Sequence, residues 1–379
     1  MVNAVLAPIL AREFGLSAGQ LGLLSSMYFL AFALTQLPFG VLLDRFGPRR
    51  VNAVLLLVAA AGGAWFAHAD TATSAILARA VIGVGVSMAL MSALTAFALW
   101  YPAEKVSTMN SIAFAVGILG AMTVTVPLEM LLRVWSWREA FMLIAAMSFA
   151  ASLVLLFWVP ERIAASKATL AMQLRDLGRL LSDAAFLRLA VCLGASQSAA
   201  ISLQSLWIAT WLRDVAGYDT AQVARGLLAV HIAMIAGYVF FGTAADRRVR
   251  QGKSALPLMM GGVAGSAASL GLIVAGFGSL LVWALFVGLS TAGVLGYSIL
   301  TRRYPRDMAG RANTAINVAA FIGMFAGQWG IGLVLDRWPQ TPDGYAAGAY
   351  PWALAIVLAA QVAGLAWLWN GRRLLALGT

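Results

Sequence analysis

The stretch Gly40-Val41-Leu42-Leu43-Asp44-Arg45-Phe46-Gly47-Pro48-Arg49-Arg50 decides how the rest of the sequence is interpreted. It holds one acid, three arginines and a Gly-Pro turn between two apolar runs, one arriving from Gly19 and one leaving from Val51. A charged turn between two runs of membrane-spanning length indicates a short loop at a membrane surface.

Composition extends this interpretation to the whole chain. Of the 379 residues, 61% are hydrophobic and only 11% are charged, whereas a soluble protein carries about 25% charged residues. Apolar runs of about twenty residues recur from end to end. These runs are continuously apolar and do not alternate as barrel strands do, so they predict helices whose backbone groups bond within each segment. We therefore expect an all-α integral membrane protein.

Other classes of protein fit the sequence less well. One Cys and two His argue against a disulfide framework and against a zinc or haem site built by the protein. The sequence holds no Ser-His-Asp set, metal-spaced cluster or phosphate loop, so we expect no enzyme, no cofactor and no metal. The net charge of +11 does not indicate nucleic acid, because Lys and Arg gather in every second loop.

The apolar runs predict a series of spans. Residues Met1 to Ala11 reach only roughly 16 Å against about 30 Å of hydrocarbon, so we expect the outer half of a first helix that is shortened at its N-terminus. The other predicted spans are about Gly19–Leu43, Val51–Phe66, Ser74–Leu99, Thr108–Leu132, a sixth ending at Val159, Leu189–Thr210, Val223–Ala244, Ala255–Val274, Leu280–Ser298, Ala312–Leu335 and Pro351–Trp369.

The second half of the chain repeats features of the first. Gly40-x-x-x-Asp44-Arg45 returns as Gly242-x-x-x-Asp246-Arg247, and Tyr101-Pro102 returns as Tyr304-Pro305 at nearly the same offset. Between the halves, 161–188 is the longest polar stretch. Leucines recur there at helical spacing, which indicates an amphipathic helix on the membrane surface.

The pattern Gly-x-x-x-Asp-Arg-x-Gly-x-Arg-Arg of residues 40–50 resembles the signature of the major facilitator superfamily, and its echo supports that resemblance. The resemblance implies two pseudo-symmetric six-helix bundles in twelve spans, related as parallel repeats. We expect residues 1–160 to form the first bundle, with helix 1 incomplete, 161–188 a cytoplasmic linker and 189–379 the second bundle.

The placement of basic residues predicts the orientation. Six lie in the loops predicted to be outside, namely Arg12, Arg133, Arg138, Arg213, Arg225 and Arg337. Arg79 lies within a span, and the other nineteen of the 26 Lys and Arg residues lie in the cytoplasmic loops. The positive-inside rule then predicts a cytoplasmic C-terminus, in what we expect to be a bacterial cytoplasmic (inner) membrane.

The resemblance assigns a gating role to the repeated motif. Asp44 is expected to bind the N-terminus of the span near Ala312, where helix N–H groups carry partial positive charge. In the family this contact latches the two halves together, and Glu104 is the candidate acid for relaying it. Asp246 would act likewise at the start of the fifth span. The alternative is that these charges only set topology. We favour the latch, whose predicted residues are Gly40, Asp44, Arg45, Gly47, Arg49, Arg50, Gly242, Asp246 and Arg247.

Three titratable side chains within spans are candidates for proton coupling or substrate binding. Arg79, in Arg79-x-x-x-Gly83-x-Gly85, resembles a second family motif; it binds an acid or an anion at depth, or it reaches the outer surface. Glu129 is either a titrating carboxylate facing Arg79 or the partner of Arg133 four residues on. His231 is either a proton switch or a structural residue.

Polar side chains within the spans predict a cavity. Ser198, Ser202 and Ser205 share one face of the seventh span, and Gln197 and Gln204 share another. Such groups either line a cavity or join helices, and the resemblance favours a cavity. The predicted cavity-lining residues are Tyr28, Gln36, Gln197, Ser198, Ser202, Gln204, Tyr238, Tyr297 and Asn317.

The resemblance and these polar residues predict a secondary transporter that moves a small polar organic solute, with an anion as one candidate, by alternating access with proton coupling. We expect it to act as a monomer in the bilayer, with a small-molecule substrate and protons as its partners and no nucleic acid. One alternative is a drug/proton antiporter of the same superfamily, although the fifth span lacks that group's glycine pattern. Another is a membrane sensor that transports nothing.

Overall fold

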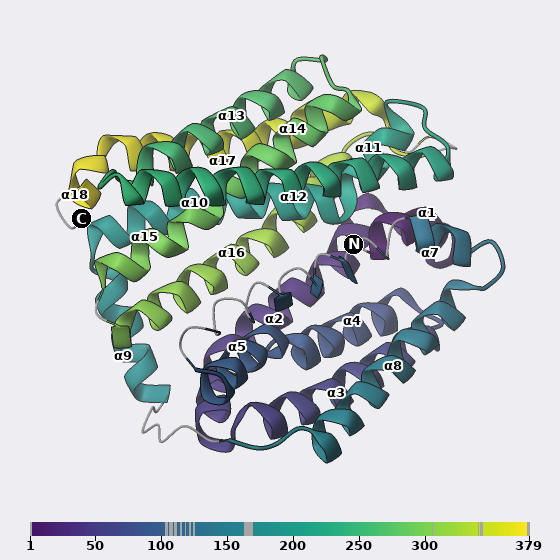
Figure 1. Cartoon of the computed structure of the whole chain (residues 1–379). Helices are drawn as coiled ribbons and strands as arrows, with labels where there is room; N and C mark the ends of the chain where they lie inside the picture. The colour runs from purple at the N-terminus through teal and green to yellow at the C-terminus, as the bar shows by residue number, and fades with distance from the viewer. Residues whose placement is uncertain are drawn as a thin grey trace. The chain divides into compact units, whose positions relative to one another are not determined.

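The computed structural model describes residues 2–376 except 103–104, 106–108, 110–111, 114–115, 118, 121–122, 124–125, 163–169, 305, 340 and 342–343. These described residues are almost entirely helical, and they include no β-strand beyond an isolated bridge between Thr341 and Gly344. Figure 1 shows the helices in chain order.

Ten helical stretches of the described residues are long and apolar enough to cross a membrane. They are α2 (Ala18–Phe46), α3 (Pro48–Ala67), α4 (Ala72–Val86) with α5 (Ala89–Trp100), α8 (Trp137–Trp158), α10 (Ala184–Ser202) with η1 (Leu203–Trp207) and α11 (Ile208–Asp214), α12 (Thr220–Arg250), α13 (Leu256–Val274), α14 (Leu280–Ser290) with η2 (Thr291–Val294) and α15 (Leu295–Arg303), α16 (Arg306–Leu335), and η3 (Ala347–Ala349) with α17 (Tyr350–Asn370).

Four shorter helices complete the described chain. Helix α1 (Val2–Phe14) has 13 residues, and α7 (Val126–Leu131) is the end of the predicted fifth span, whose earlier part is interrupted by residues outside the described ranges. Helix α9 (Leu170–Leu181) confirms the amphipathic helix predicted in the linker, and α18 (Arg372–Ala376) follows the last span. The first and fifth predicted spans are therefore the two that are not among the ten.

The chain packs as two compact units, which we describe separately. One comprises residues 24–175, and the other comprises residues 1–23 together with 176–379. This grouping follows packing, and the division into residues 1–160, 161–188 and 189–379 stays a prediction.

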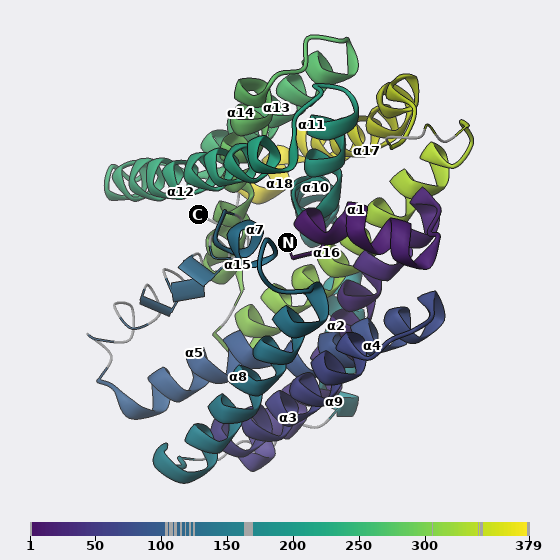
Figure 2. The same ribbon diagram turned by 90° about the vertical axis from the view of Figure 1, so that its right-hand side faces the viewer.

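In the unit of residues 24–175, α3 is the central helix. It packs against α4 on one side and α8 on the other, and α3 and α8 lie side by side in Figures 1 and 2. The buried Phe66 ring on α3 stacks with Trp137 and Phe141 of α8, at centroid distances of 5.4 and 4.4 Å. Ser152 Oγ donates a 2.7 Å hydrogen bond to the Ala53 carbonyl, so α8 is also fixed to α3 by a buried polar contact.

In the unit of residues 1–23 and 176–379, the core lies between α10, α13, α16 and α17. Helix α10 packs against α16 and α17, and α13 packs against α14 and α17. The buried cluster at its centre includes Phe186, Leu193, Met259, Val263 and Ile316. Large apolar side chains also remain on the surface, for example Leu281 at 69% exposure, as expected of helices that face lipid.

Backbone geometry repeats where the sequence repeats. Tyr101 ends α5 with φ −108° and ψ 149°, and Tyr304 ends α15 with φ −106° and ψ 151°. A proline follows each tyrosine in the sequence, and the residue before a proline is driven from helical into extended backbone. A glycine with positive φ also follows each Asp-Arg pair, although at a different distance: Gly47 adopts φ +82° and Gly252 adopts φ +68°.

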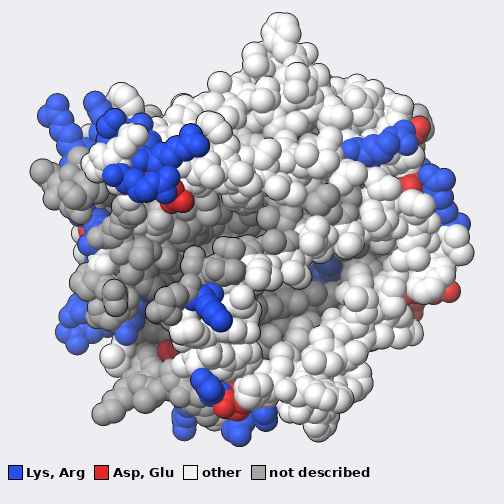
Figure 3. Space-filling view, in the orientation of Figure 1, with Lys and Arg blue, Asp and Glu red and all other residues white. Residues whose placement is uncertain are grey.

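Basic side chains gather at one end of the second unit. Helix α12 ends in Arg247, Arg248 and Arg250, and α18 begins with Arg372 and Arg373. Figure 3 shows Lys and Arg concentrated at the left edge of the view, where Figure 1 places α15 and α18. This asymmetry is the pattern expected of a cytoplasmic face.

Candidate functional site

Arg79 lies between two aromatic rings. Its guanidinium carbon is 5.8 Å from the centroid of the Tyr28 ring and 5.6 Å from that of Phe66. The Nε atom is buried and has no hydrogen-bond partner, and no ion pair joins Arg79 to an acid among the described residues. Cation–π contacts stabilise such a charge by about 0.5–2 kcal/mol each, but they supply no hydrogen-bond acceptor to Nε. Anion binding by Arg79 stays a prediction.

Glu129 lies in α7 and is buried, at 8% exposure. Its two carboxylate oxygens accept hydrogen bonds from Arg133 Nε at 2.9 Å and Arg133 Nη2 at 3.3 Å. The structure therefore pairs Glu129 with Arg133 and not with Arg79, which was the other partner that the sequence left open. Whether Glu129 also titrates during transport stays a prediction.

The arginines after Gly47 converge on an acid that the sequence analysis did not single out. Arg49 Nε and Arg50 Nε lie 3.5 and 3.6 Å from Glu161 Oε2, just beyond α8. Arg49 Nη1 also donates a 3.0 Å hydrogen bond to the carbonyl of Val159. The motif thereby ties the start of α3 to the end of α8, while the predicted relay acid Glu104 lies outside the described residues.

The other residues of this motif lie on α2 or in the turn. Gly40 and Asp44 are half-buried on α2, and Arg45 is exposed and lies over the Phe46 ring at 5.3 Å. The gating role of these residues stays a prediction.

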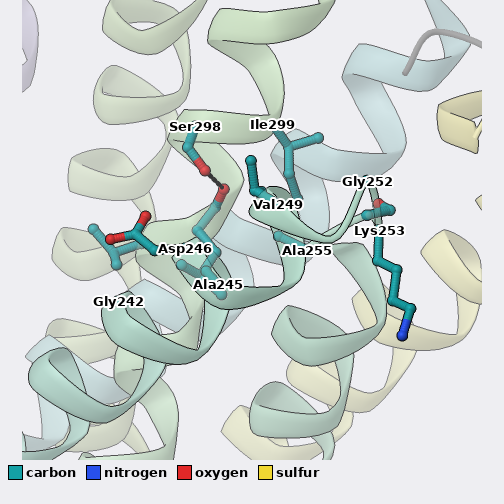
Figure 4. A pocket seen from close by; sticks show the side chains of 12 residues that line it. Gly242, Ala245, Asp246, Val249, Gly252, Lys253, Ala255, Ser298 and Ile299 are labelled. Carbon is teal, nitrogen blue, oxygen red and sulfur yellow. Dashed lines mark hydrogen bonds between the residues drawn. The ribbon is translucent and has the colours of Figure 1, made fainter.

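The echo of the motif borders a cavity of about 620 Å³ (Figure 4). Gly242 and Asp246 of α12 form one wall, Lys253 follows at the turn, and Ser298 of α15 stands opposite. The Ser298 hydroxyl donates to the Leu295 carbonyl at 2.8 Å, so it is satisfied within its own helix. The cavity thus holds one acid and one cation on flexible side chains. Arg247, the next residue along the chain, is exposed. The predicted partner of Asp246 is the start of the fifth span, where residues 106–108 and 110–111 lie outside the described ranges.

The seventh span is not a uniform α-helix, because a π-helical turn, η1, separates α10 from α11. Ser198 Oγ donates to the Ala320 carbonyl of α16 at 3.1 Å, and Ser205 Oγ donates to Gln328 Oε1 of α16 at 3.3 Å. Ser202 Oγ donates to the Ser198 carbonyl within its own helix. Ser198 therefore joins α10 to α16. Ser198 and Ser202 also line a cavity of about 590 Å³ beside α9, α16 and α17, and the role of this cavity in transport stays a prediction.

The glutamine face of the same span points to other helices. Gln197 Nε2 lies 3.5 Å from the Tyr297 hydroxyl of α15, and Gln204 Nε2 lies 3.6 Å from Met234 Sδ of α12. Tyr238, four residues after Met234 on α12, is 39% exposed. These side chains form a loosely bonded polar group within one unit, and their place in a transport cavity stays a prediction.

The remaining predicted residues have mainly local partners. His231 is buried, and its Nδ1 lies 2.6 Å from the Leu227 carbonyl. Because a carbonyl can only accept, Nδ1 carries the proton and Nε2 is the atom that can titrate. Gln36 Nε2 donates to the Ser87 carbonyl at 3.1 Å, at the break between α4 and α5, and Asn317 is half-buried on α16.

A family model described as Major Facilitator Superfamily matches residues 1–328. The chain belongs to the major facilitator superfamily. It is 26% identical over 262 residues to the "Probable sulfoacetate transporter" of Cupriavidus necator, covering 64% of this chain and 60% of that protein. It is 26% identical over 156 residues to the 4-hydroxybenzoate transporter of Acinetobacter baylyi, covering 41% and 34%, and 30% identical over 115 residues to a nitrate/nitrite transporter of Picosynechococcus, covering 30% and 21%. The chain thus spans 60% or less of these curated relatives.

Solved structures of superfamily transporters share the fold. A bacterial homologue of the human lysosomal transporter Spinster matches with a TM-score of 0.77 at 15% identity, covering 98% of this chain and 92% of that one. A D-xylose-proton symporter matches with a TM-score of 0.70 at 18% identity, covering 95% and 92%. These likenesses confirm the fold class predicted from the sequence.

Two acids of the linker are structural residues that superfamily motifs did not predict. Asp176 of α9 is buried and pairs with Arg179 and with Arg311 of α16. Asp183 caps α10, accepts from the Ala185 amide at 2.8 Å and pairs with Tyr304. Each of these acids lies about one helical turn from a basic residue in the sequence, and that spacing could have indicated an ion-pairing role.

Burial alone would raise the pKa of the Asp183 carboxyl. The hydrogen bonds from Tyr304 and the Ala185 amide, together with the nearby Arg303, outweigh burial and hold that pKa below its ordinary value. Burial and the contact with Asp183 raise the pKa of Tyr304 to about 12. The pair therefore persists across the physiological pH range with the carboxylate ionised and the phenol neutral.

Proposed function

We propose that this superfamily member transports a small organic anion by alternating access, with transport coupled to protons. The observation that carries the proposal is Arg79, an arginine within a membrane span whose buried Nε has no hydrogen-bond partner. An arginine at the centre of a span costs about 2.5–3.5 kcal/mol, which is an upper bound for Arg79 in the first third of its span, and a substrate anion would offset that cost.

The relatives support an anionic substrate. The proteins of Cupriavidus necator, Acinetobacter baylyi and Picosynechococcus are named as transporters of sulfoacetate, 4-hydroxybenzoate and nitrate or nitrite, and all of these solutes are anions. Their shared chemistry is a planar or tetrahedral oxyanion. A guanidinium presents parallel N–H donors that match such oxygens, so Arg79 suits this class of substrate.

The aromatic rings around Arg79 favour an organic anion over an inorganic one. Tyr28 and Phe66 hold the guanidinium from two sides and provide apolar surface beside it. A carboxylate or sulfonate on a short carbon skeleton would place its charge on Arg79 and its carbon atoms against the rings.

Proton coupling is assigned to His231, with Glu129 as the second candidate. His231 is buried within α12, and its Nδ1 is fixed by the Leu227 carbonyl, so a proton could bind and leave at Nε2. Glu129 is already compensated by Arg133, which makes it the weaker candidate. The likeness in fold to a D-xylose-proton symporter is consistent with a proton-coupled cycle.

The proposal is tested by solute uptake into proteoliposomes, with and without an inward proton gradient. The panel contains sulfoacetate, 4-hydroxybenzoate, nitrate and the neutral sugar D-xylose. We expect saturable uptake of an organic anion that the proton gradient accelerates. Uptake of D-xylose alone, or export of lipophilic cations as by a drug antiporter, would contradict the proposal.

We further propose a bacterial inner membrane location, a monomer and a cytoplasmic C-terminus. The basic ends of α12 and α18 support the orientation. A reporter fused after the last residue, active only in the cytoplasm, tests it. Activity of a reporter that works only in the periplasm would reverse the orientation.

A further inference from the structure

Asp336, directly after α16, binds the N-terminus of α2. Its Oδ1 accepts a 2.7 Å hydrogen bond from the Ala18 amide, and its Oδ2 accepts from the Gly19 amide at 2.9 Å and from Ser17 Oγ at 2.7 Å. The first N–H groups of a helix have no partner within the helix and carry partial positive charge. Asp336 satisfies two of them with a full negative charge, across more than 300 residues of sequence.

Glycines allow the two helices to meet backbone to backbone at this point. A Cβ atom at Gly22 would lie 2.7 Å from the Gln328 carbonyl oxygen, and one at Gly19 would lie 2.6 Å from Asp336 Oδ2. A Cβ atom at Gly332 would collide with the Ala18 carbonyl. The contact is therefore a close-packed junction about two turns long, with the carboxylate at its end.

The spacing at this junction matches the gating motif. Gly332-x-x-x-Asp336-Arg337 is a third copy of the pattern found at Gly40 and at Gly242. The spacing has a physical reason, because residues four apart share a helical face. The glycine lets the end of a partner helix approach, and the acid one turn later meets its N–H groups.

The two copies on α2 and α16 are reciprocal. Asp44 near the C-terminus of α2 is predicted to bind the start of α16, and Asp336 at the C-terminus of α16 binds the start of α2. Helix α2 has 29 residues, a length of roughly 43 Å, so the two junctions belong to opposite faces of the membrane.

We propose that Asp336 is an outer latch that holds the outward side of the transporter closed and releases when that side opens. Hydrogen bonds of 2.7–2.9 Å are lost once the donor and acceptor separate beyond about 3.5 Å, so a separation of the start of α2 from the end of α16 would break this junction. Asp44 and Asp336 would then close the inner and outer sides in alternation. The inference rests on membership of a transporter superfamily and not on the solute proposed above.

The test measures exposure of an introduced cysteine to a membrane-impermeant thiol reagent added outside intact cells. The reporter is Ser205→Cys, because Ser205 is 5% exposed on η1, which packs against α1 and α16. The native Cys192 is fully buried, so the parent chain measures background labelling. No substrate is needed, so failure of the anion proposal would leave this test unaffected.

We expect Asp336→Asn to raise the labelling rate about fivefold. Gly332→Ala, which forces the same junction apart without changing charge, should raise it in the same direction. Asp70→Asn is the matched control, because Asp70 is an acid with a 92% exposed side chain, and it should leave labelling unchanged. If Asp336→Asn labels no faster than the control in protein of normal membrane abundance, the latch is refuted, and an increase confined to Gly332→Ala would refute the role of the carboxylate.

Discussion

Replacement of Arg79 by glutamine separates substrate binding from stability. Arg79 has two aromatic contacts and no acid partner among the described residues, so its charge is incompletely compensated. An anionic substrate would supply that compensation. Arg79→Gln should therefore impair transport while leaving the folded protein at least as stable as the parent.

The magnitudes follow from the contacts. A hydrogen bond to a charged group is worth about 1.5–3 kcal/mol, and each 1.4 kcal/mol is a factor of ten. Loss of one such bond to the substrate therefore lowers kcat/KM by about 10- to 150-fold. For stability, an insertion cost of about 2.5–3.5 kcal/mol is partly offset by the two cation–π contacts, so the variant should gain about 1 kcal/mol.

The assay compares initial uptake of the organic anion with thermal unfolding in detergent. Arg79→Lys keeps the charge but loses the planar fork, so its uptake should fall between the parent and Arg79→Gln. Arg225→Gln is the matched control, because it removes an exposed arginine from α12. It should change neither uptake nor unfolding.

Two results would refute this reasoning. Anion uptake by Arg79→Gln at the parental rate would show that Arg79 does not bind substrate. A large loss of thermal stability would show that the guanidinium has a structural partner that its aromatic surroundings do not supply.

Three further predictions concern the loops. Asp44→Asn should abolish uptake at unchanged membrane abundance, measured by transport and immunoblot; normal uptake would remove the inner latch. Glu161→Gln should lower the free energy of unfolding by about 1 kcal/mol, since two weak ion pairs, one of them to Arg49, are lost, and unchanged thermal unfolding would contradict it. Because the folded-state pKa of Asp183 is lowered, its contribution to stability is present above about pH 4 and is lost as pH falls further, whereas the raised pKa of Tyr304 preserves the contact toward pH 12. Asp183→Asn should remove the acid-side part of a pH–stability curve, and an unchanged curve would exclude this pair as its source.

The spans, the repeat and the turns were accessible from the sequence because each depends on neighbouring residues. Twenty apolar residues suffice to predict a helix in lipid, and a glycine before Pro48 suffices to predict a tight turn, which Gly47 forms with φ +82°. The same holds for α9, whose leucines at helical spacing define its apolar face. The gating motif was recognised as a contiguous pattern.

Partner choice was decided by the tertiary structure. The sequence left Glu129 with two possible partners, and packing paired it with Arg133. Ser198 and Ser202 of the seventh span were expected in a cavity; they border one, and Ser198 is also hydrogen-bonded to α16, a partner that the sequence did not indicate. Such outcomes depend on helix rotation and crossing angle, which one helix's own pattern does not set.

Asp336 shows most clearly what the sequence determines and what only the tertiary structure determines. By sequence alone Asp336 is an acid in a third copy of the Gly-x-x-x-Asp-Arg pattern, and the sequence does not indicate its partner. Only the folded chain brings it to the amides of Ala18 and Gly19, because three glycines on two distant helices let the backbones touch there. Local hydrophobicity determined which segments enter the membrane, and the close packing of those segments determined which charges meet.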